Sequence, residues 1–153
     1  MDKNYLLETA NNLKQVSNSS SKEYELKAEL LIAEMNKLML NRNDLEKLVG
    51  KDNFEMMQEN HSNHVRFIAS ILANYNSEVL VETILWVFRA YRSHGFSTNY
   101  WSAQLNAWMK ILLNHLSQES YNEIFPLYEW MQINIPVFVK VSDEKLESTN
   151  TFH

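Results

Sequence analysis

The fold is decided by residues 51–94, which read KDNFEMMQENHSNHVRFIASILANYNSEVLVETILWVFRAYRSH. This stretch lies between Gly50 and Gly95, the only two glycines of the chain, and it contains no proline. Strand-rich and mixed folds need many tight turns with positive φ, which glycine usually supplies. Average usage would give roughly 10 glycines and 8 prolines in a chain of this length, whereas this chain has 2 of each. The sequence therefore predicts an all-α protein whose helices are joined by short connectors rich in Ser and Asn.

Hydrophobic spacing divides this stretch into two helices at residues 76–77. The first is expected over about 53–74, with one continuous stripe made of Phe54, Met57, His61, His64, Ile68, Ile71 and Tyr75. The second is expected over 78–93, with a stripe made of Leu80, Ile84, Val87, Phe88 and Tyr91. Gly95 is expected to stop the second helix in a left-handed conformation, with Phe96 folding back on the last turn.

The same spacing predicts further helices over about 3–16, 22–40, 43–49 and 97–116, and a last helical region that begins after Ser117. Pro126 should kink or split that last region, and Pro136 should end it. Ser20 and Glu23 have the spacing of a capping box. The polar residues from 142 onward predict a loose tail. We therefore expect a helical domain over 1–141, with about six to seven helices in globin-like packing, and a flexible tail over 142–153.

Composition narrows the classes of function. The 153 residues suit a single domain, and the net charge of −5 with scattered Lys and Arg argues against nucleic-acid binding. The absence of cysteine excludes disulfides and thiolate chemistry. No apolar run approaches the ~20 residues of a membrane span, and no secretory signal is evident, so we expect a cytoplasmic protein. Two glycines leave little room for a phosphate-cradling loop, and no catalytic pattern stands out, so we expect no enzyme.

The first candidate site is formed by His61 and His64, which lie three residues apart and share one face of the expected helix. Such a pair could hold a transition metal or place an imidazole beside haem, with His94 and His115 as further ligands. The alternative is that one histidine is buried with a partner while the other borders the core.

The second candidate site is a set of aromatic side chains, comprising Trp86, Phe88, Tyr91, Phe96, Tyr100, Trp101 and Trp108. These rings could either fill the core or line a ligand cavity between helices, with methionines as adaptable wall. The predicted pocket lining, which combines both candidates, is Met57, His61, His64, Ile68, Trp86, Tyr91, Trp101 and Trp108.

Several stretches give the sequence a resemblance to bacterial sensory modules. They read DLEKLVG at 44–50, ENHSNHVRFIASIL at 59–72, LVETILWVFRAYRSHGF at 80–96, YWSAQLNAW at 100–108 and PLYEWM at 126–131. Together they resemble the haem-less, globin-like sensor domains of stress and sporulation regulators, and also the helical modules that precede some cobalamin-binding domains. The first resemblance implies a homodimer with an apolar cavity where haem would otherwise sit, which in some such modules takes a fatty-acid-like ligand.

Three functions remain open on the sequence. The first is a non-enzymatic regulatory module that binds a small apolar ligand such as a fatty acid and acts through dimer or partner contacts, for example as a stand-alone inhibitor of a sensor kinase. The second is a haem or metal protein that uses His61 and His64. The third is a structural bundle without a cavity.

Overall fold

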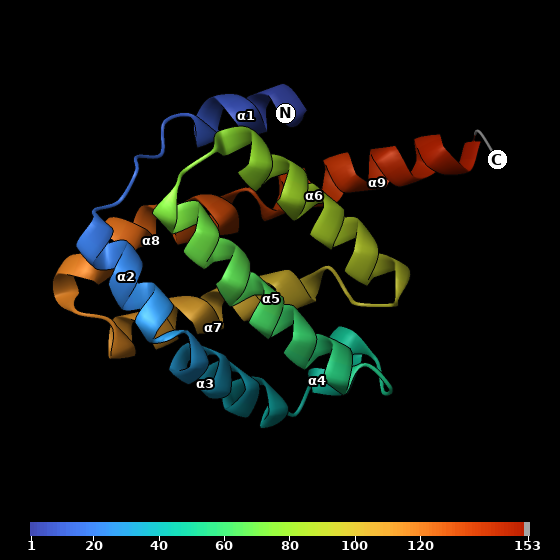
Figure 1. The fold of residues 1–153 in the computed structure, drawn as a ribbon. Helices are drawn as coiled ribbons and strands as arrows, with labels where there is room; N and C mark the ends of the chain where they lie inside the picture. Colours follow the sequence, from blue (N-terminus) through green and yellow to red (C-terminus); the bar gives the residue numbers. More distant parts are fainter. Residues whose placement is uncertain (152–153) are drawn as a thin grey trace.

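The computed structural model describes the backbone of residues 1–151 and the side chains of residues 1–144. Over this part the chain forms nine helices and no strand, which confirms the all-α prediction (Figure 1). The helices are α1 (Lys3–Ala10), α2 (Asn18–Leu26), α3 (Ala28–Leu40), α4 (Leu45–Val49), α5 (Phe54–Ala73), α6 (Ser77–Ser93), α7 (Asn99–His115), α8 (Gln118–Ile133) and α9 (Ile135–Thr151). The predicted count of six to seven helices is wrong, and globin-like packing stays a prediction.

Two of the expected helices end earlier than their hydrophobic spacing suggests. The helix predicted over 22–40 is interrupted at Lys27, whose backbone leaves the helical region at φ −93° and ψ 5°. The Lys27 ammonium donates to the His115 carbonyl at 2.6 Å, at the end of α7. The helix predicted over 3–16 ends at Ala10. The connector after it is held by Gln15, whose amide donates to the Leu72 carbonyl at 2.6 Å.

Both prolines are accommodated within helices. Helix α8 runs through Pro126 as a single helix, so the predicted split does not occur. Helix α8 ends at Ile133, before Pro136, and Pro136 lies in the first turn of α9. A proline is tolerated there because the first N–H groups of a helix have no intrahelical acceptor. The expectation that Pro136 ends the last helix is therefore wrong.

Helix α9 extends into the segment expected to be a loose tail. Its backbone is helical from Ile135 to Thr151, Ser142 is buried, and Asp143 forms an ion pair with Arg92 of α6. The segment 142–151 is thus helical rather than irregular. The rest of the predicted tail, namely residues 152–153 and the side chains from 145 onward, lies outside the described residues.

Both glycines follow the end of a helix, as predicted for Gly95. Gly50 has φ +96° after α4, and Gly95 has φ +93° after α6, a region that L side chains rarely adopt. Beyond Gly95, the Phe96 N–H donates to the Tyr91 carbonyl at 3.2 Å, and the Phe96 ring packs against the Tyr91 ring at 5.1 Å. The predicted fold-back of Phe96 is confirmed.

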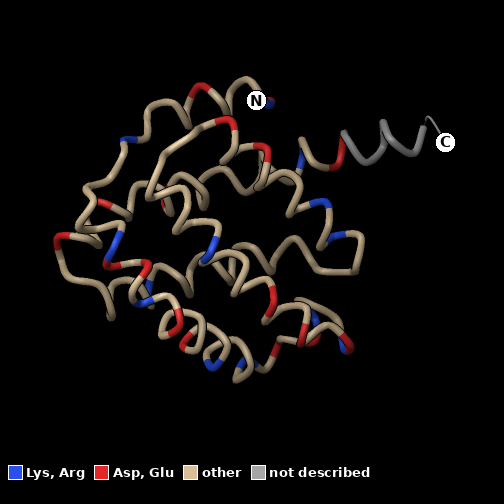
Figure 2. The backbone as a smooth tube through the Cα atoms, in the orientation of Figure 1, with Lys and Arg blue, Asp and Glu red and all other residues tan. Residues whose placement is uncertain are grey.

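Helices α5 and α6 pack against different sets of helices. Helix α5 packs against α2 and α3, whereas α6 packs against α1 and α9, and α7 lies across α3 and α8. Figure 1 shows α6 running back in the direction opposite to α5, on the other side of the molecule from α3. Figure 2 shows acidic and basic positions interspersed along the described chain. The candidate site lies between α5 and α6.

The N-termini of α2 and α8 are capped by each other's glutamate. Glu123 of α8 accepts from the Ser17 N–H at 2.7 Å, the Ser17 hydroxyl at 2.9 Å and the Ser20 hydroxyl at 2.6 Å. Glu23 of α2 accepts from the Ser117 N–H at 2.6 Å, the Ser117 hydroxyl at 2.7 Å and the Ser120 hydroxyl at 2.8 Å.

This reciprocal arrangement rests on a repeated Ser-x-x-Ser-x-x-Glu motif, at 17–23 and again at 117–123. The predicted Ser20–Glu23 capping box is wrong, because Ser17 is the N-cap of α2 and Glu23 bonds to the other helix. Each glutamate reaches back toward the start of the opposite helix, so α2 and α8 are antiparallel.

We expect Glu23→Gln to lower the free energy of unfolding at pH 7 by about 1–2 kcal/mol, since it removes charge-assisted hydrogen bonds that water partly screens. Burial alone would raise the pKa of Glu23, but its hydrogen bonds to Ser117, Ser120 and Lys27 lower it to about 2. The stabilisation is therefore present above the carboxyl's ordinary pKa of 4.5 and is lost as the pH falls toward 2.

Urea melts of wild type, Glu23→Gln and the exposed control Glu25→Gln, at pH 7 and pH 3, measure this effect. The difference in the free energy of unfolding between wild type and Glu23→Gln should be smaller at pH 3 than at pH 7. At pH 7, Glu25→Gln should have the same free energy of unfolding as wild type. An advantage that is equal at both pH values would contradict the assignment.

Candidate functional site: a cavity between α5, α6 and α7

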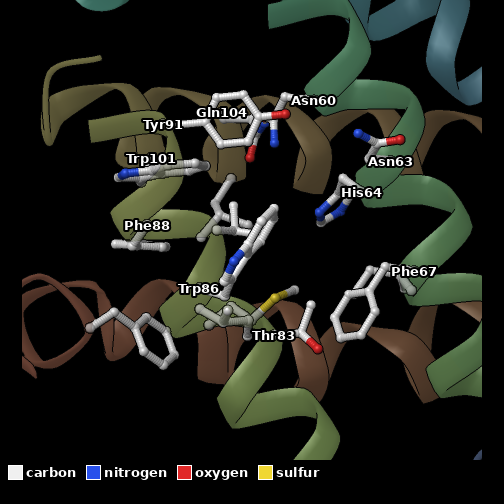
Figure 3. A pocket seen from close by; sticks show the side chains of 16 residues that line it. Asn60, Asn63, His64, Phe67, Thr83, Trp86, Phe88, Tyr91, Trp101 and Gln104 are labelled. Carbon is white, nitrogen blue, oxygen red and sulfur yellow. The ribbon is translucent and has the colours of Figure 1, made fainter. Parts of the chain in front are cut away.

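The candidate site is a cavity of about 230 Å³ between α5, α6 and α7. Its apolar wall is made of Phe67, Ile68, Ile84, Trp86, Val87, Phe88, Trp101, Leu105, Met131 and Phe138. Its polar lining is made of Asn60, Asn63, His64, Thr83, Tyr91 and Gln104. Figure 3 shows the polar ends of Asn60, Gln104 and Tyr91 gathered at one end of the cavity, with the His64 ring turned into it.

Helical periodicity explains how these side chains come together. Positions 60, 63–64 and 67–68 lie on one face of α5, and positions 83–84, 87–88 and 91 lie on the facing side of α6. The base of the cavity is supplied by α7, α8 and α9. The Trp86 side chain is 61% exposed, so it stands at the mouth, where the cavity opens to solvent.

The polar end is held by a buried triad of Asn60, Tyr100 and Gln104. The Tyr100 hydroxyl donates to Asn60 Oδ1 at 2.8 Å, and Gln104 Nε2 donates to the Tyr100 hydroxyl at 2.9 Å and also to Asn60 Oδ1. Both hydrogens of the Gln104 amide are thereby used. Its Oε1 oxygen has no protein partner among the described residues and remains available to a ligand.

A second polar chain begins at His64. Its Nε2 lies 2.8 Å from the Tyr128 hydroxyl, which in turn lies 2.8 Å from the Tyr24 hydroxyl. Both tyrosines are fully buried. Burial raises the pKa of Tyr24 and of Tyr128, so both hydroxyls stay protonated.

Behind the cavity, the two histidines pack on Trp108. The His64 ring stacks on the Trp108 indole at a centroid distance of 4.9 Å, and the His61 ring meets it edge-on at 6.1 Å. His61 Nδ1 lies 2.7 Å from Asn36 Oδ1. Among the described residues, three buried side-chain atoms have no hydrogen-bond partner, namely His61 Nε2, Trp108 Nε1 and, on α6, Arg89 Nη1.

The cavity carries no formal charge. Burial lowers the pKa of His61 to about 3, and burial together with the neighbouring His61 lowers that of His64 to about 3. No Lys, Arg, Asp or Glu is among the described residues that line the cavity. Glu59 and Arg66 line a neighbouring polar groove between α3 and α5, which shares only Asn63 with the cavity. The site is therefore suited to an uncharged guest.

The structure brings together five of the eight predicted pocket residues, namely His64, Ile68, Trp86, Tyr91 and Trp101. The other three, Met57, His61 and Trp108, are fully buried in the core and do not line the cavity. Of the two histidines, His61 is the buried one with a partner and His64 is the one that borders a cavity.

Several lining residues were missed by sequence reasoning, above all the polar ones, Asn60, Asn63 and Gln104. The signal was present, since Asn60 lies one helical turn before His64 and Gln104 lies one turn after Tyr100. Polar residues on an apolar helix face are informative because burial without a partner is costly.

The described residues contain no group of three or more His, Asp or Glu side chains that could hold a metal ion. His94 is exposed at the end of α6, and His115 lies 3.9 Å from Glu34. The predicted further ligands are therefore not gathered around His61 and His64. Within the part of the chain that the structure describes, no helix combines the length and apolarity needed to cross a bilayer.

A second hollow, of about 420 Å³, lies beneath the connector between α1 and α2. Its lining includes the charged side chains of Lys14 and Glu123, and the latter is already committed to capping α2. This hollow lacks the aromatic wall of the cavity between α5, α6 and α7, which remains the better candidate.

Comparison with known proteins adds no family to this picture. No protein-family model matches the chain, and no curated protein or solved structure is significantly similar to it. The function is therefore inferred from the geometry of the site.

Proposed function

We propose that this chain is a non-enzymatic regulatory module that binds a small apolar ligand in the cavity between α5, α6 and α7 and acts through dimer or partner contacts. The observation that carries the proposal is the cavity itself, of about 230 Å³, with a largely aromatic wall and convergent polar groups at one end. An apolar cavity with a few oriented polar groups is typical of small-molecule sites. The resemblance to globin-like sensor domains favours a fatty-acid-like ligand.

The position of the cavity supports a regulatory role. Its two sides are formed by α5, which packs on α2 and α3, and by α6, which packs on α1 and α9. A ligand that prefers one separation of α5 and α6 would shift the balance between two packings, by as much as its affinity differs between them. The ligand would thus act on two separate groups of helices.

Exposed apolar side chains offer a surface through which such a shift could reach another protein. Leu26 is 86% exposed at the end of α2, and Leu30 and Leu40 are exposed on α3. Exposed apolar side chains are characteristic of protein contacts where they gather into a patch. We propose that a second copy of the chain or a regulatory partner binds here.

Native mass spectrometry of the purified full chain tests the proposal directly, since it reports a co-purified small molecule and the oligomeric state together. Thermal unfolding with added apolar compounds is the second measurement. A ligand at 100 times its Kd should stabilise the native state by about 2.7 kcal/mol, which corresponds to a rise in Tm of about 5–10 °C for a domain of this size.

We expect Ile84→Trp to abolish that rise in Tm, because Ile84 lines the cavity and an indole there would occupy the ligand's space. Without ligand the variant should unfold within about 1.5 kcal/mol of wild type, since the added atoms enter existing space. Val79→Trp is the matched control, because Val79 lies on the same helix, is 47% exposed and does not line the cavity. Equal ligand-induced shifts in both variants would place the binding site elsewhere.

A further inference from the structure

The two buried tyrosines determine which nitrogen of His64 carries the proton. The chain runs from Tyr24 to Tyr128 to His64 Nε2, with both links at 2.8 Å. Each hydroxyl has one hydrogen to donate, and the neutral imidazole carries its hydrogen on one nitrogen only. Three orders of donation are possible along such a chain, and the one in which Tyr24 and His64 both donate to Tyr128 leaves the buried Tyr128 hydrogen without an acceptor.

In the first of the other two orders, Tyr24 donates to Tyr128, and Tyr128 donates to His64 Nε2. Every hydroxyl hydrogen then has an acceptor, and the imidazole hydrogen is on Nδ1. In the second order, His64 Nε2–H donates to Tyr128, and Tyr128 donates to Tyr24. The Tyr24 hydrogen would then have no acceptor, because Tyr24 is fully buried and Tyr128 is its only hydrogen-bond partner among the described residues.

The first order is favoured because a buried donor without an acceptor costs about 1–3 kcal/mol. His64 is then an Nδ1–H tautomer. This nitrogen has no protein partner among the described residues, and it is not one of the fully enclosed, unpaired atoms of the core. Since His64 lines the cavity and its ring is turned into it, the Nδ1–H is a free donor on the cavity wall (Figure 3).

The same end of the cavity disfavours an anion. The Gln104 Oε1 oxygen is an unpaired acceptor there, and no Lys or Arg is among the described residues that line the site. The low pKa of His64, about 3, keeps its ring uncharged at neutral pH. A carboxylate in this cavity would lose its hydration without gaining a counter-ion, which is costly.

The aromatic side chains of the cavity wall favour a ligand that contains an aromatic ring. Trp86, Phe88 and Trp101 present aromatic faces and edges to the cavity, and Phe88 and Trp101 are themselves stacked at 4.4 Å. An apolar cavity of about 150 Å³ binds benzene, so the volume of about 230 Å³ here suits one aromatic ring with a short substituent.

We propose that the ligand is a neutral aromatic molecule bearing a carbonyl acceptor, and that the Nδ1–H of His64, oriented through Tyr24 and Tyr128, donates a hydrogen bond to that carbonyl. This inference rests on the proposed function, because it specifies the ligand of the same cavity. It separates a neutral carbonyl compound from the fatty-acid-like carboxylate that the resemblance implies. His64 is in this sense a binding residue, and Tyr128 is a positioning residue.

The first test concerns the tautomer and requires no ligand. Long-range ¹H–¹⁵N correlation spectra of the histidine-labelled full chain distinguish protonated from unprotonated ring nitrogens. We expect the His64 signals of wild type, assigned by comparison with His64→Gln, to report a proton on Nδ1. A proton on Nε2 would overturn the inference.

The second test is calorimetric titration with acetophenone, ethylbenzene, benzoate and octanoate. Acetophenone and ethylbenzene should bind, whereas benzoate and octanoate should bind at least ~100-fold more weakly than acetophenone because of their buried charge. Tyr128→Phe should weaken the binding of acetophenone by about three- to tenfold and leave the affinity for ethylbenzene unchanged. Tyr24→Phe is the matched control, since it removes an equally buried hydroxyl but leaves Tyr128 donating to His64, and acetophenone affinity should stay within twofold of wild type.

The outcomes separate the two proposals. The inference fails if ethylbenzene binds but benzoate or octanoate binds as tightly as acetophenone or more tightly. It also fails if Tyr128→Phe weakens the binding of acetophenone and of ethylbenzene alike. In both cases the cavity remains a ligand site. If none of the four compounds binds to the folded wild type at millimolar concentration, the inference and the proposed function fail together. If Tyr128→Phe does not fold, the inference is still tested in wild type by the tautomer of His64 and by the ratio of the acetophenone and benzoate affinities.

Discussion

Lowering the pH from 7.5 to 5 is expected to reduce the free energy of unfolding by about 4 kcal/mol, which is a large part of the stability of a typical domain. The cause is the pair of buried histidines. Burial lowers the pKa of both His61 and His64 from 6.5 to about 3. Each ring therefore remains uncharged in the folded state across this pH range.

The sign follows from proton binding in the two states. Below pH 6.5 the unfolded chain binds protons at these rings, whereas the folded chain binds them only near pH 3. Stability is therefore full above the ordinary pKa of histidine and falls as the pH drops below it. Each ring contributes about 2 kcal/mol between pH 7.5 and 5, since one pH unit corresponds to about 1.4 kcal/mol.

Urea melts at several pH values between 8 and 5 measure this loss. His61→Gln, which can retain a hydrogen bond to Asn36, should roughly halve the loss, and His94→Gln, at an exposed site, should retain the wild-type dependence. A free energy of unfolding that does not change between pH 7.5 and 5 would show that both rings can be protonated without unfolding the chain.

Replacing Trp108 with alanine is expected to lower the free energy of unfolding by about 3–5 kcal/mol. The indole is completely buried, and both histidine rings pack on it, with His64 stacked at 4.9 Å. Its removal would leave a void beside two imidazoles that the surrounding helices cannot fill without moving. Trp108→Phe should cost much less, because a ring is retained and the Trp108 Nε1–H has no hydrogen-bond partner to lose.

Equilibrium unfolding in guanidinium, followed by circular dichroism, measures the effect. Trp86→Ala is the matched control, since that indole is 61% exposed and should change the free energy of unfolding by less than about 1 kcal/mol. If the alanine variants at positions 86 and 108 were equally stable, Trp108 would not be the centre of the core. A Trp108→Ala chain that does not fold would agree with a loss of unfolding free energy at the upper end of the expected range.

The helices whose ends are determined by nearby residues could be predicted from the sequence. The helices before and after residues 76–77 begin and end close to their expected positions, because hydrophobic spacing and the Gly95 stop act within a few residues. The break at Lys27 could not be predicted, because its ammonium bonds to the His115 carbonyl, far away in the sequence. Glu23 was assigned to its own helix for the same reason, since its true partners are Ser117 and Ser120.

Part of the candidate site could likewise be predicted from the sequence, and part of it could not. His64, Trp86 and Tyr91 share faces of helices that periodicity can order, so their convergence could be anticipated. The exclusion of His61 depends on how α5 is rotated about its axis against α3, which no local pattern specifies. The triad of Asn60, Tyr100 and Gln104 likewise required the packing of α5 on α7 to be known.

The mutual capping of α2 and α8 bears on the order in which the chain can fold. During synthesis, Ser17 and Ser20 emerge from the ribosome about a hundred residues before Glu123, the carboxylate that their helix needs. Contacts between such distant parts of a chain form late and slow the search for the native state. A nascent chain stopped before α8 would therefore hold an α2 helix that forms and melts repeatedly, and the first stable intermediate is expected only once α8 has been made.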